Sequence, residues 1–144
     1  MINVVKLREN AVIPTKGSRC AAGYDLYACV DEAVVIEPHK TAKIGTGLAM
    51  ELPSSCFGAI YARSGLATKH GLRPANCTGI CDNDYRGEYV VALHNDTDDV
   101  QIVEPGERIA QFILRRYDDV YFNEVDSLSE TERGAGGFGS TGKQ

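Results

Sequence analysis

The amino-acid sequence predicts an all-β domain of the sandwich, barrel or jelly-roll type. Short segments rich in β-branched and aromatic residues recur along the chain, and Pro, Gly and Asn residues separate them. No long stretch has the 3.6-residue apolar repeat that would indicate helices alternating with the strands. At 144 residues, the chain is long enough for one domain of this kind.

Nine segments have the composition of strands, and one short segment has that of a helix. The helix is predicted over residues 64–70, where Ser64 could act as the N-cap and Gly71 could end it. The predicted strands are residues 2–7, 24–30, 33–36, 43–52, 57–62, 88–94, 100–103, 109–116 and 121–125.

The last part of the chain is predicted to be an arm. Residues 1–126 are expected to form the β-domain, and the more polar residues 127–144 a flexible C-terminal arm. Glycines crowd into residues 134–142, and the same stretch offers backbone N–H groups, hydroxyls and an aromatic ring that could close over a phosphorylated ligand. It matches G-x-G-x-x-G, but too few residues follow for the helix of a dinucleotide site. A disordered chain end is the alternative.

Composition excludes several classes of function. The net charge of −5 argues against a general nucleic-acid or membrane surface. The chain shows no leader segment and no apolar run near the roughly eighteen residues of a membrane span, so a cytoplasmic protein is expected, or one inside the host cell if its source is viral or a phage. The five cysteines contain no C-x-x-C and are expected to be reduced, and the histidines lack metal-ligand spacing.

A candidate phosphate site lies at the start of the predicted helix. Residues 62–67 place Arg63, Ser64 and Gly65 there. The unpaired N–H groups of a helix start attract phosphate, and an arginine adds a bidentate contact. An ordinary helix start with a solvated arginine is the alternative.

A candidate catalytic carboxylate lies in residues 79–88, a turn dense in acidic side chains. Two apolar residues lead directly into Asp82, which suggests a carboxylate at the mouth of a pocket. An aspartate is ionised at neutral pH and could orient a water molecule and accept its proton. Asp84 and Glu88 are expected to face solvent or to pair with Arg86. A charged hairpin turn is the alternative.

Two further segments place a polar side chain within an apolar strand. Alternation would bury Tyr24 and Leu26 and turn Asp25 to the other face, which a strand with a solvent aspartate explains equally well. Alternation would also place Gln111 on the same face as Ile109 and Ile113. A polar amide on an apolar face needs partners, and it is either a satisfied core residue or a ligand contact.

Taken together and in order, these segments resemble the five motifs of the trimeric deoxyuridine triphosphatases, the dUTPases. The motifs are AGYDLYA at 22–28, ARSGLA at 62–67, GICDNDYRGE at 79–88, PGERIAQ at 105–111 and RGAGGFGSTG at 133–142. Because they run from near the N-terminus to the end, the resemblance covers essentially the whole chain.

The resemblance implies a jelly-roll or distorted β-barrel subunit with one short helix, assembling as a homotrimer whose sites are shared between subunits and closed by the arms. It implies hydrolysis of dUTP to dUMP and pyrophosphate with Mg²⁺. Asp82 corresponds to the carboxylate that activates the water attacking the α-phosphorus, and Tyr85 to the ring beneath the deoxyribose that rejects UTP. Asp25 corresponds to a residue that supports the metal through water, so no direct protein ligand of the metal is expected.

The other matched residues correspond to substrate-binding positions. The positions that read uracil are Asn76, Gly79, Ile80 and Cys81. The triphosphate-binding positions are Arg63, Ser64, Gly65 and Gln111. The positions in the arm are Arg133, Phe138, Gly139, Ser140 and Thr141. Phe138 would stack over uracil, and Ser140 and Thr141 would bind the γ-phosphate.

Two other functions are weighed against this one. The same-fold dCTP deaminases carry a tryptophan where Tyr85 stands and a catalytic glutamate where Ala92 stands, and this chain has no tryptophan. A non-catalytic nucleotide-binding regulatory protein would have lost the acidic residue or the arm, and both are present. Two departures from the dUTPase pattern, Ala62 for proline and Cys81 for isoleucine or valine, remove no reacting group.

Overall fold

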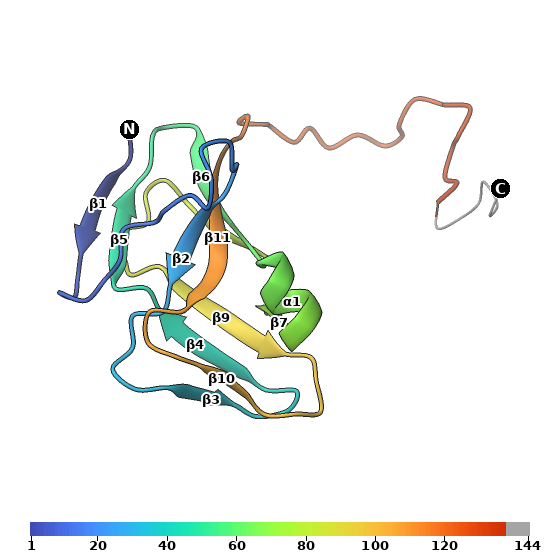
Figure 1. Ribbon diagram of the computed structural model, residues 1–144. Helices are drawn as coiled ribbons and strands as arrows, with labels where there is room; N and C mark the ends of the chain where they lie inside the picture. Colours follow the sequence, from blue (N-terminus) through green and yellow to red (C-terminus); the bar gives the residue numbers. More distant parts are fainter. Residues whose placement is uncertain (138–144) are drawn as a thin grey trace.

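The computed structural model describes residues 1–137 of the chain, in which eleven strands and one short helix form (Figure 1). The elements are β1 (Asn3–Lys6), β2 (Tyr24–Tyr27), β3 (Val34–Ile36), β4 (Thr41–Gly45), β5 (Leu48–Glu51), β6 (Cys56–Tyr61), α1 (Ser64–His70), β7 (Leu72–Pro74), β8 (Thr78–Cys81), β9 (Val90–Asn95), β10 (Gln101–Val103) and β11 (Arg108–Arg116). Across residues 1–137 the helix falls short of the length and apolar character that crossing a membrane requires.

The strands pair antiparallel in four small sheets. The largest has the order β2–β11–β6–β8, and a three-stranded sheet has the order β4–β9–β7. β1 pairs with β5, and β3 with β10. Strands from opposite ends of the chain are neighbours, such as β2 and β11, as expected of a jelly roll rather than a simple meander. The predicted all-β class with one short helix is therefore confirmed.

One apolar core joins the larger sheets. Leu26 of β2, Ile44 of β4, Leu93 of β9 and Ile109 of β11 are fully buried and belong to the same cluster. Leu66 is the buried residue of α1 and packs into this cluster. The core holds the strands in place, so that the turns at their ends have fixed starting points.

The predicted strand over residues 43–52 is wrong, because the chain turns sharply within it. Gly47 has a φ of 66° and separates β4 from β5, which belong to different sheets. A Cβ atom at Gly47 would also lie 2.6 Å from the Cys29 sulfur atom. Only glycine combines the left-handed backbone with this close approach.

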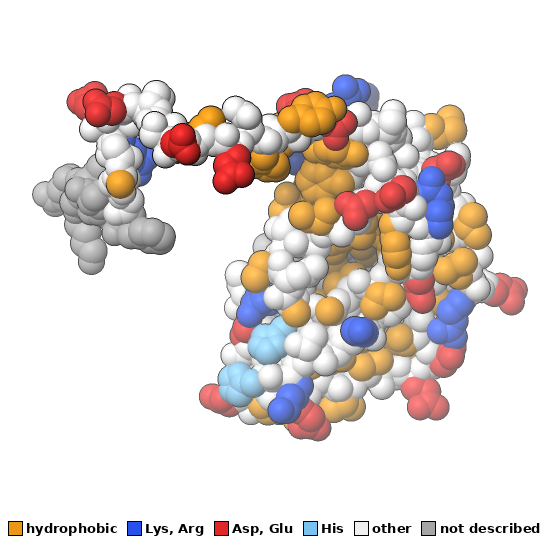
Figure 2. Space-filling view, turned by 180° about the vertical axis from the view of Figure 1, so that it is seen from behind, with side chains coloured by type: hydrophobic (Ala, Val, Ile, Leu, Met, Phe, Trp, Pro, Cys, Tyr) orange, Lys and Arg blue, Asp and Glu red, His pale blue; other side chains and the backbone are white. Residues whose placement is uncertain are grey.

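The predicted strand over residues 121–125 is also wrong, because these residues leave the body of the molecule (Figure 1). Tyr121 and Phe122 are 98% and 97% exposed and find no strand partner within residues 1–137. Figure 2 shows the chain extending away from the body with acidic side chains along it. A sequence rich in β-formers makes a strand only where a neighbouring strand is available.

Two short strands were absent from the sequence prediction. β7 ends in a proline and β8 contains a glycine, and neither residue type favours a strand. Both form because they extend sheets whose other strands are already paired, β7 next to β9 and β8 next to β6. The other predicted strands overlap the observed ones and are confirmed; they are β1, β2, β3, β6, β9, β10 and β11.

Candidate active site

A cavity of about 120 Å³ lies where β7 and β8 meet β9, and we call it the hairpin cavity. Its lining residues are Ile60, Pro74, Asn76, Gly79, Ile80, Cys81, Val90, Val91 and Ala92. β8 is an edge strand, paired with β6 on one side, so backbone groups on its other side are available to a ligand.

Close packing fixes the turn that leads into β8. The Cys77 N–H donates to the Pro74 carbonyl oxygen (3.0 Å), and the Thr78 N–H donates to that of Asn76 (2.6 Å). A Cβ atom at Gly79 would lie 3.1 Å from Cβ of Ile60 and 3.3 Å from Nδ2 of Asn76. Gly79 therefore lets Asn76 fold back over the edge strand, at the wall of the hairpin cavity.

A second cavity of about 220 Å³ adjoins the first, and we call it the Asp82 cavity. Its lining residues are Ile80, Cys81, Asp82, Tyr85, Glu88, Tyr89 and Val90. Three of these also line the hairpin cavity. Asp82 follows β8 directly and is exposed, so the predicted carboxylate does stand at the mouth of a pocket.

The turn after Asp82 is held by hydrogen bonds of its own. The Tyr85 N–H donates to the Asp82 carbonyl oxygen (3.2 Å), and the Tyr85 hydroxyl donates to the Glu88 carbonyl oxygen (3.0 Å). The predicted partners of Glu88 are wrong. The Glu88 carboxylate accepts a hydrogen bond from the Gly47 N–H (2.7 Å). Arg86 instead forms an ion pair with Glu51, with 3.5 Å between Nη2 of Arg86 and Oε1 of Glu51. The sequence could not show that the β4–β5 turn lies against this loop.

The wall between the two cavities is apolar in character. Burial raises the pKa of the Cys81 thiol to about 11, so the thiol is neutral at physiological pH. Burial also raises the pKa of the Tyr89 hydroxyl, which has no hydrogen-bond partner within residues 1–137. The Tyr89 ring packs at 6.1 Å from that of Tyr85 and 6.3 Å from that of Phe112.

Asp25 lies between two arginines, in an arrangement we call the arginine cluster. Its Oδ1 is 2.9 Å from Nε of Arg63, and its Oδ2 is 3.3 Å from Nη1 of Arg108. The expected burial of Leu26 is confirmed, but the expected positions of its neighbours are wrong: Asp25 is 6% exposed, whereas Tyr24 is 39% exposed. A buried carboxylate needs compensating charge and hydrogen bonds, and these come from residues far along the chain.

The helix start differs in detail from the prediction. The range Ser64–His70 is confirmed, and Gly71 ends the helix with a left-handed φ of 61°. The N-cap, however, is Arg63, in an extended conformation and without a side-chain capping bond, so the prediction that Ser64 is the cap is wrong. Ser64 and Gly65 are both exposed in the first turn of the helix. The first N–H groups of the helix are thus left available.

Gln111 joins the arginine cluster through the sheet register. It pairs with Asp25 on β2 and with Tyr61 on β6. A β-bulge between Arg108 and Ala110 buries Ile109 and Ala110 in succession, so the expected shared face of Ile109 and Gln111 is wrong. Gly23 provides the space for this amide, since a Cβ atom there would lie 2.9 Å from Oε1 of Gln111.

The two groups of predicted site residues lie at opposite ends of β8. The register places Asp25, Gln111, Tyr61 and Thr78 in one row across the largest sheet. Asp82 is four residues beyond Thr78, which corresponds to about 13 Å of extended strand. Within a single chain, the Asp82 cavity and the arginine cluster are therefore separate sites.

Comparison with known proteins assigns the chain to a family. Residues 9–142 match the dUTPase family model. The chain belongs to the dUTPase family. It is 48% identical over 131 residues to a deoxyuridine 5′-triphosphate nucleotidohydrolase of Desulfitobacterium hafniense, covering 90% of this chain and 87% of that protein. The corresponding Acinetobacter baumannii enzyme is 44% identical over 140 residues, covering 96% and 93%.

Solved dUTPase structures share the fold over nearly the whole chain. The dUTPase of Staphylococcus bacteriophage 80alpha, solved with dUpNHpp, superposes with a TM-score of 0.84 at 28% identity and covers 99% of this chain and 98% of that one. The aligned part of the chain thus spans the residues of both cavities and of the arginine cluster. This dUTPase-family chain is an enzyme, as are its named relatives.

The described part of the arm contributes one predicted site residue. Arg133 donates from Nε to the Gly136 carbonyl oxygen (3.0 Å), closing a turn in which Gly134 has a φ of 50°. This turn lies away from the body (Figure 1). The other predicted arm residues lie outside the described residues; they are Phe138, Gly139, Ser140 and Thr141.

The side chains that could bind a metal are scattered over the described part of the chain. Within residues 1–137, no group of three or more His, Cys, Asp or Glu side chains could hold a metal ion. Both oxygens of Asp25 face arginines. The described side chains fit a cation that is bound mainly by phosphate oxygens and water, as Mg²⁺ commonly is.

Proposed function

We propose that this protein hydrolyses dUTP to dUMP and pyrophosphate. The observation that carries the proposal is the Asp82 cavity, in which an exposed carboxylate directly adjoins an edge-strand cavity lined by β8 and Asn76. The 48% identity to a deoxyuridine 5′-triphosphate nucleotidohydrolase supports it.

In the proposed reaction, Asp82 activates the attacking water. The carboxylate accepts a proton as the water oxygen bonds to the α-phosphorus, and the bond from that phosphorus to the bridging oxygen breaks, releasing pyrophosphate. The Tyr85 N–H bond to the Asp82 carbonyl oxygen supports this role, because it fixes the backbone that carries the carboxylate.

Uracil recognition is assigned to the hairpin cavity. Backbone groups of Gly79, Ile80 and Cys81 and the amide of Asn76 would pair with the polar edge of the base. The Tyr85 ring, at the Asp82 cavity, would pack beneath the deoxyribose and leave no space for a 2′-hydroxyl. A site whose polar groups match the hydrogen-bond donors and acceptors of uracil discriminates strongly against a base with a different arrangement of them.

Triphosphate binding is assigned to Arg63, Ser64, Gly65 and Gln111. Asp25 orients the Arg63 guanidinium group through a bond of 2.9 Å, and the exposed helix start offers N–H groups beside it. Mg²⁺ would sit on the phosphates, with Asp25 acting through its water shell, and would neutralise part of the triphosphate charge.

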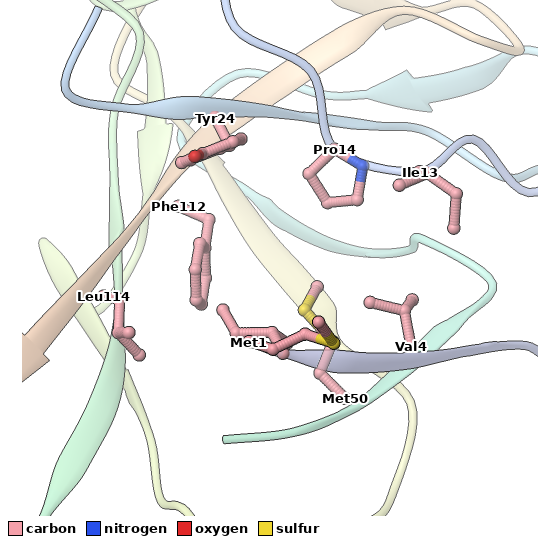
Figure 3. A pocket seen from close by; sticks show the side chains of 9 residues that line it. Met1, Val4, Ile13, Pro14, Tyr24, Met50, Phe112 and Leu114 are labelled. Atoms are coloured by element: carbon pink, nitrogen blue, oxygen red, sulfur yellow. The ribbon is translucent and has the colours of Figure 1, made fainter. Parts of the chain in front are cut away.

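We also propose a homotrimer in which each site combines parts of different subunits. The separation of the Asp82 cavity from the arginine cluster supports this, because a triphosphate needs both. A second support is an apolar cavity of about 350 Å³ (Figure 3). Figure 3 shows side chains from β1, β2, β5 and β11 pointing into it, among them Val4, Tyr24 and Phe112.

The segment after β11 supplies groups that such a cavity could bury. Tyr121, Phe122 and Leu128 are almost fully exposed on the segment after β11. Burying an aromatic side chain stabilises an interface by about 2 kcal/mol, so an exposed pair of this kind favours a neighbouring subunit as partner. We propose that residues 1–126, including the exposed segment after β11, belong to the jelly-roll domain. We propose that residues 127–144 form a flexible arm, in which Arg133, Phe138, Gly139, Ser140 and Thr141 close over a bound nucleotide.

The decisive experiment is pyrophosphate release from dUTP, dCTP, dTTP and UTP, each with and without Mg²⁺. Release from dUTP alone, increased by Mg²⁺, is expected. Deamination of dCTP would instead favour the same-fold deaminases, although the methyl group of Ala92 lines the hairpin cavity where those enzymes carry an acid. Binding of dUTP without turnover would favour a regulatory protein.

A further inference from the structure

The Tyr85 ring occupies space that a side chain at position 87 would need. A Cβ atom built on Gly87 would contact the Tyr85 hydroxyl oxygen and would lie 2.6 Å from Cζ and 2.9 Å from Cε2 of the same ring. Real Cβ atoms essentially never come closer than 3.0 Å to another heavy atom. The ring is therefore folded back over the Gly87 backbone.

The requirement for glycine at position 87 is steric. Gly87 is not among the glycines with a positive φ, so its backbone conformation is open to alanine. The nearest atoms all belong to the far end of one side chain, the Tyr85 ring. A methyl group at position 87 would thus displace the ring, while the backbone of the loop could stay in place.

The remaining contacts of the ring define where it stands. Its hydroxyl donates to the Glu88 carbonyl oxygen (3.0 Å), and the Glu88 carboxylate is bound by the Gly47 N–H (2.7 Å). The buried Tyr89 ring packs against it with a centroid distance of 6.1 Å. The ring is held from three sides, with the Asp82 cavity on its open side.

We propose that Gly87 is a specificity-determining residue that acts through Tyr85. It lets the ring lie close to the loop backbone, beside the Asp82 cavity, where the proposed function has the ring exclude a ribose 2′-hydroxyl. This inference rests on the proposed hydrolysis of dUTP, since it concerns the choice between dUTP and UTP. Gly87 itself touches no reacting atom and is a positioning residue.

The test compares kcat/KM for dUTP and UTP in Gly87→Ala and in the matched control Gly17→Ala. Displacing a positioning ring by about 1 Å is expected to lower the dUTP-to-UTP ratio roughly ten- to hundredfold. Gly17 is exposed and has no atom within 4 Å of its built Cβ, so Gly17→Ala should keep the wild-type ratio. An unchanged ratio in Gly87→Ala overturns the proposal.

A double-mutant cycle separates action through the ring from general damage. Once Tyr85→Ala has removed the ring, adding Gly87→Ala should change the ratio no further. Equal further loss in that background would overturn the proposal, because Gly87 would then act independently of Tyr85.

Tyr85→Phe covers the case in which Gly87→Ala does not fold, as judged by its thermal unfolding. This variant keeps the ring but loses the bond to Glu88 and should relax selectivity in the same direction by a smaller factor; an unchanged ratio overturns the proposal. A wild-type protein that does not hydrolyse dUTP would refute the proposed function, which is a different result from any of these.

Discussion

The Asp82 cavity and the arginine cluster are built in opposite ways. The cavity is formed by the end of an edge strand and the loop that follows it, with hydrogen bonds that span three positions. The arginine cluster joins Asp25 to two distant residues. Arg63 is 38 residues and Arg108 is 83 residues from Asp25 along the chain. The proposed catalytic group therefore belongs to a locally built feature, whereas the proposed phosphate contacts depend on the whole fold.

The largest expected effect tests the local feature. Asp82→Asn should lower kcat for pyrophosphate release by roughly a thousandfold, because the amide cannot accept the water proton. Binding of the analogue dUpNHpp, measured by calorimetry, should be retained. Asp84→Asn, which changes a neighbouring exposed carboxylate, is the control and should turn over normally. Wild-type turnover in Asp82→Asn would remove this residue from the catalytic role.

The second-largest expected effect tests whether the arm completes a site formed by the Asp82 cavity and the arginine cluster. A chain ending at Glu132 should lower kcat/KM on the order of a hundredfold, because a closed site loses its lid. The body should still fold and assemble, which analytical ultracentrifugation and thermal unfolding would show. Wild-type kinetics for the shortened chain would mean that residues 133–144 play no part in turnover.

A smaller effect is expected from loosening the arginine cluster. Asp25→Asn should raise KM for dUTP and lower the free energy of unfolding by about 2 kcal/mol, because charge-assisted hydrogen bonds to two arginines are weakened. Urea unfolding and steady-state kinetics measure both changes. The control is Asp31→Asn, whose pair with Arg8 is exposed and should matter little. Equal changes in the two variants would show that burial of the cluster is irrelevant.

The smallest expected effect concerns the apolar wall at Cys81. Because the folded-state pKa of this thiol is about 11, above its ordinary 9.0, the neutral thiol is favoured by folding. Its stabilising contribution is complete below pH 9 and is lost as pH rises toward 11. Urea unfolding at pH 8 and pH 10.5 should show a smaller loss in Cys81→Val than in wild type. Cys81 also raises the pKa of Tyr89, so removing the thiol should reduce the pH dependence of both groups. Identical pH slopes in the two proteins would contradict the assignment.

The sequence predicted features that depend on neighbouring residues. The helix Ser64–His70 and its end at Gly71 followed from local composition, and Asp82 was placed at a pocket from the apolar residues before it. The sequence-based prediction was wrong where contacts with a distant segment determine the burial of a residue. The burial of Asp25 depends on Arg63 and Arg108.

The failures among the strands have the same origin. Residues 43–52 have strand composition throughout, but the left-handed turn at Gly47 sends β4 and β5 to different sheets. Residues 121–125 also have strand composition, but they have no neighbouring strand to pair with within residues 1–137. β8 was missed because its pairing with β6, and not its own residues, makes it a strand.

By itself, the sequence determined the all-β class, the short helix and the motifs that mark the chain as a dUTPase. Backbone propensity, turn chemistry and motif spacing act over a few residues, so they can be read along the chain. Only the tertiary structure decided that Asp25 is buried between two arginines, that Glu88 binds the β4–β5 turn, and that Asp82 stands apart from the arginine cluster. These outcomes depend on contacts between segments brought together by burial of a common core, and no local pattern encodes them.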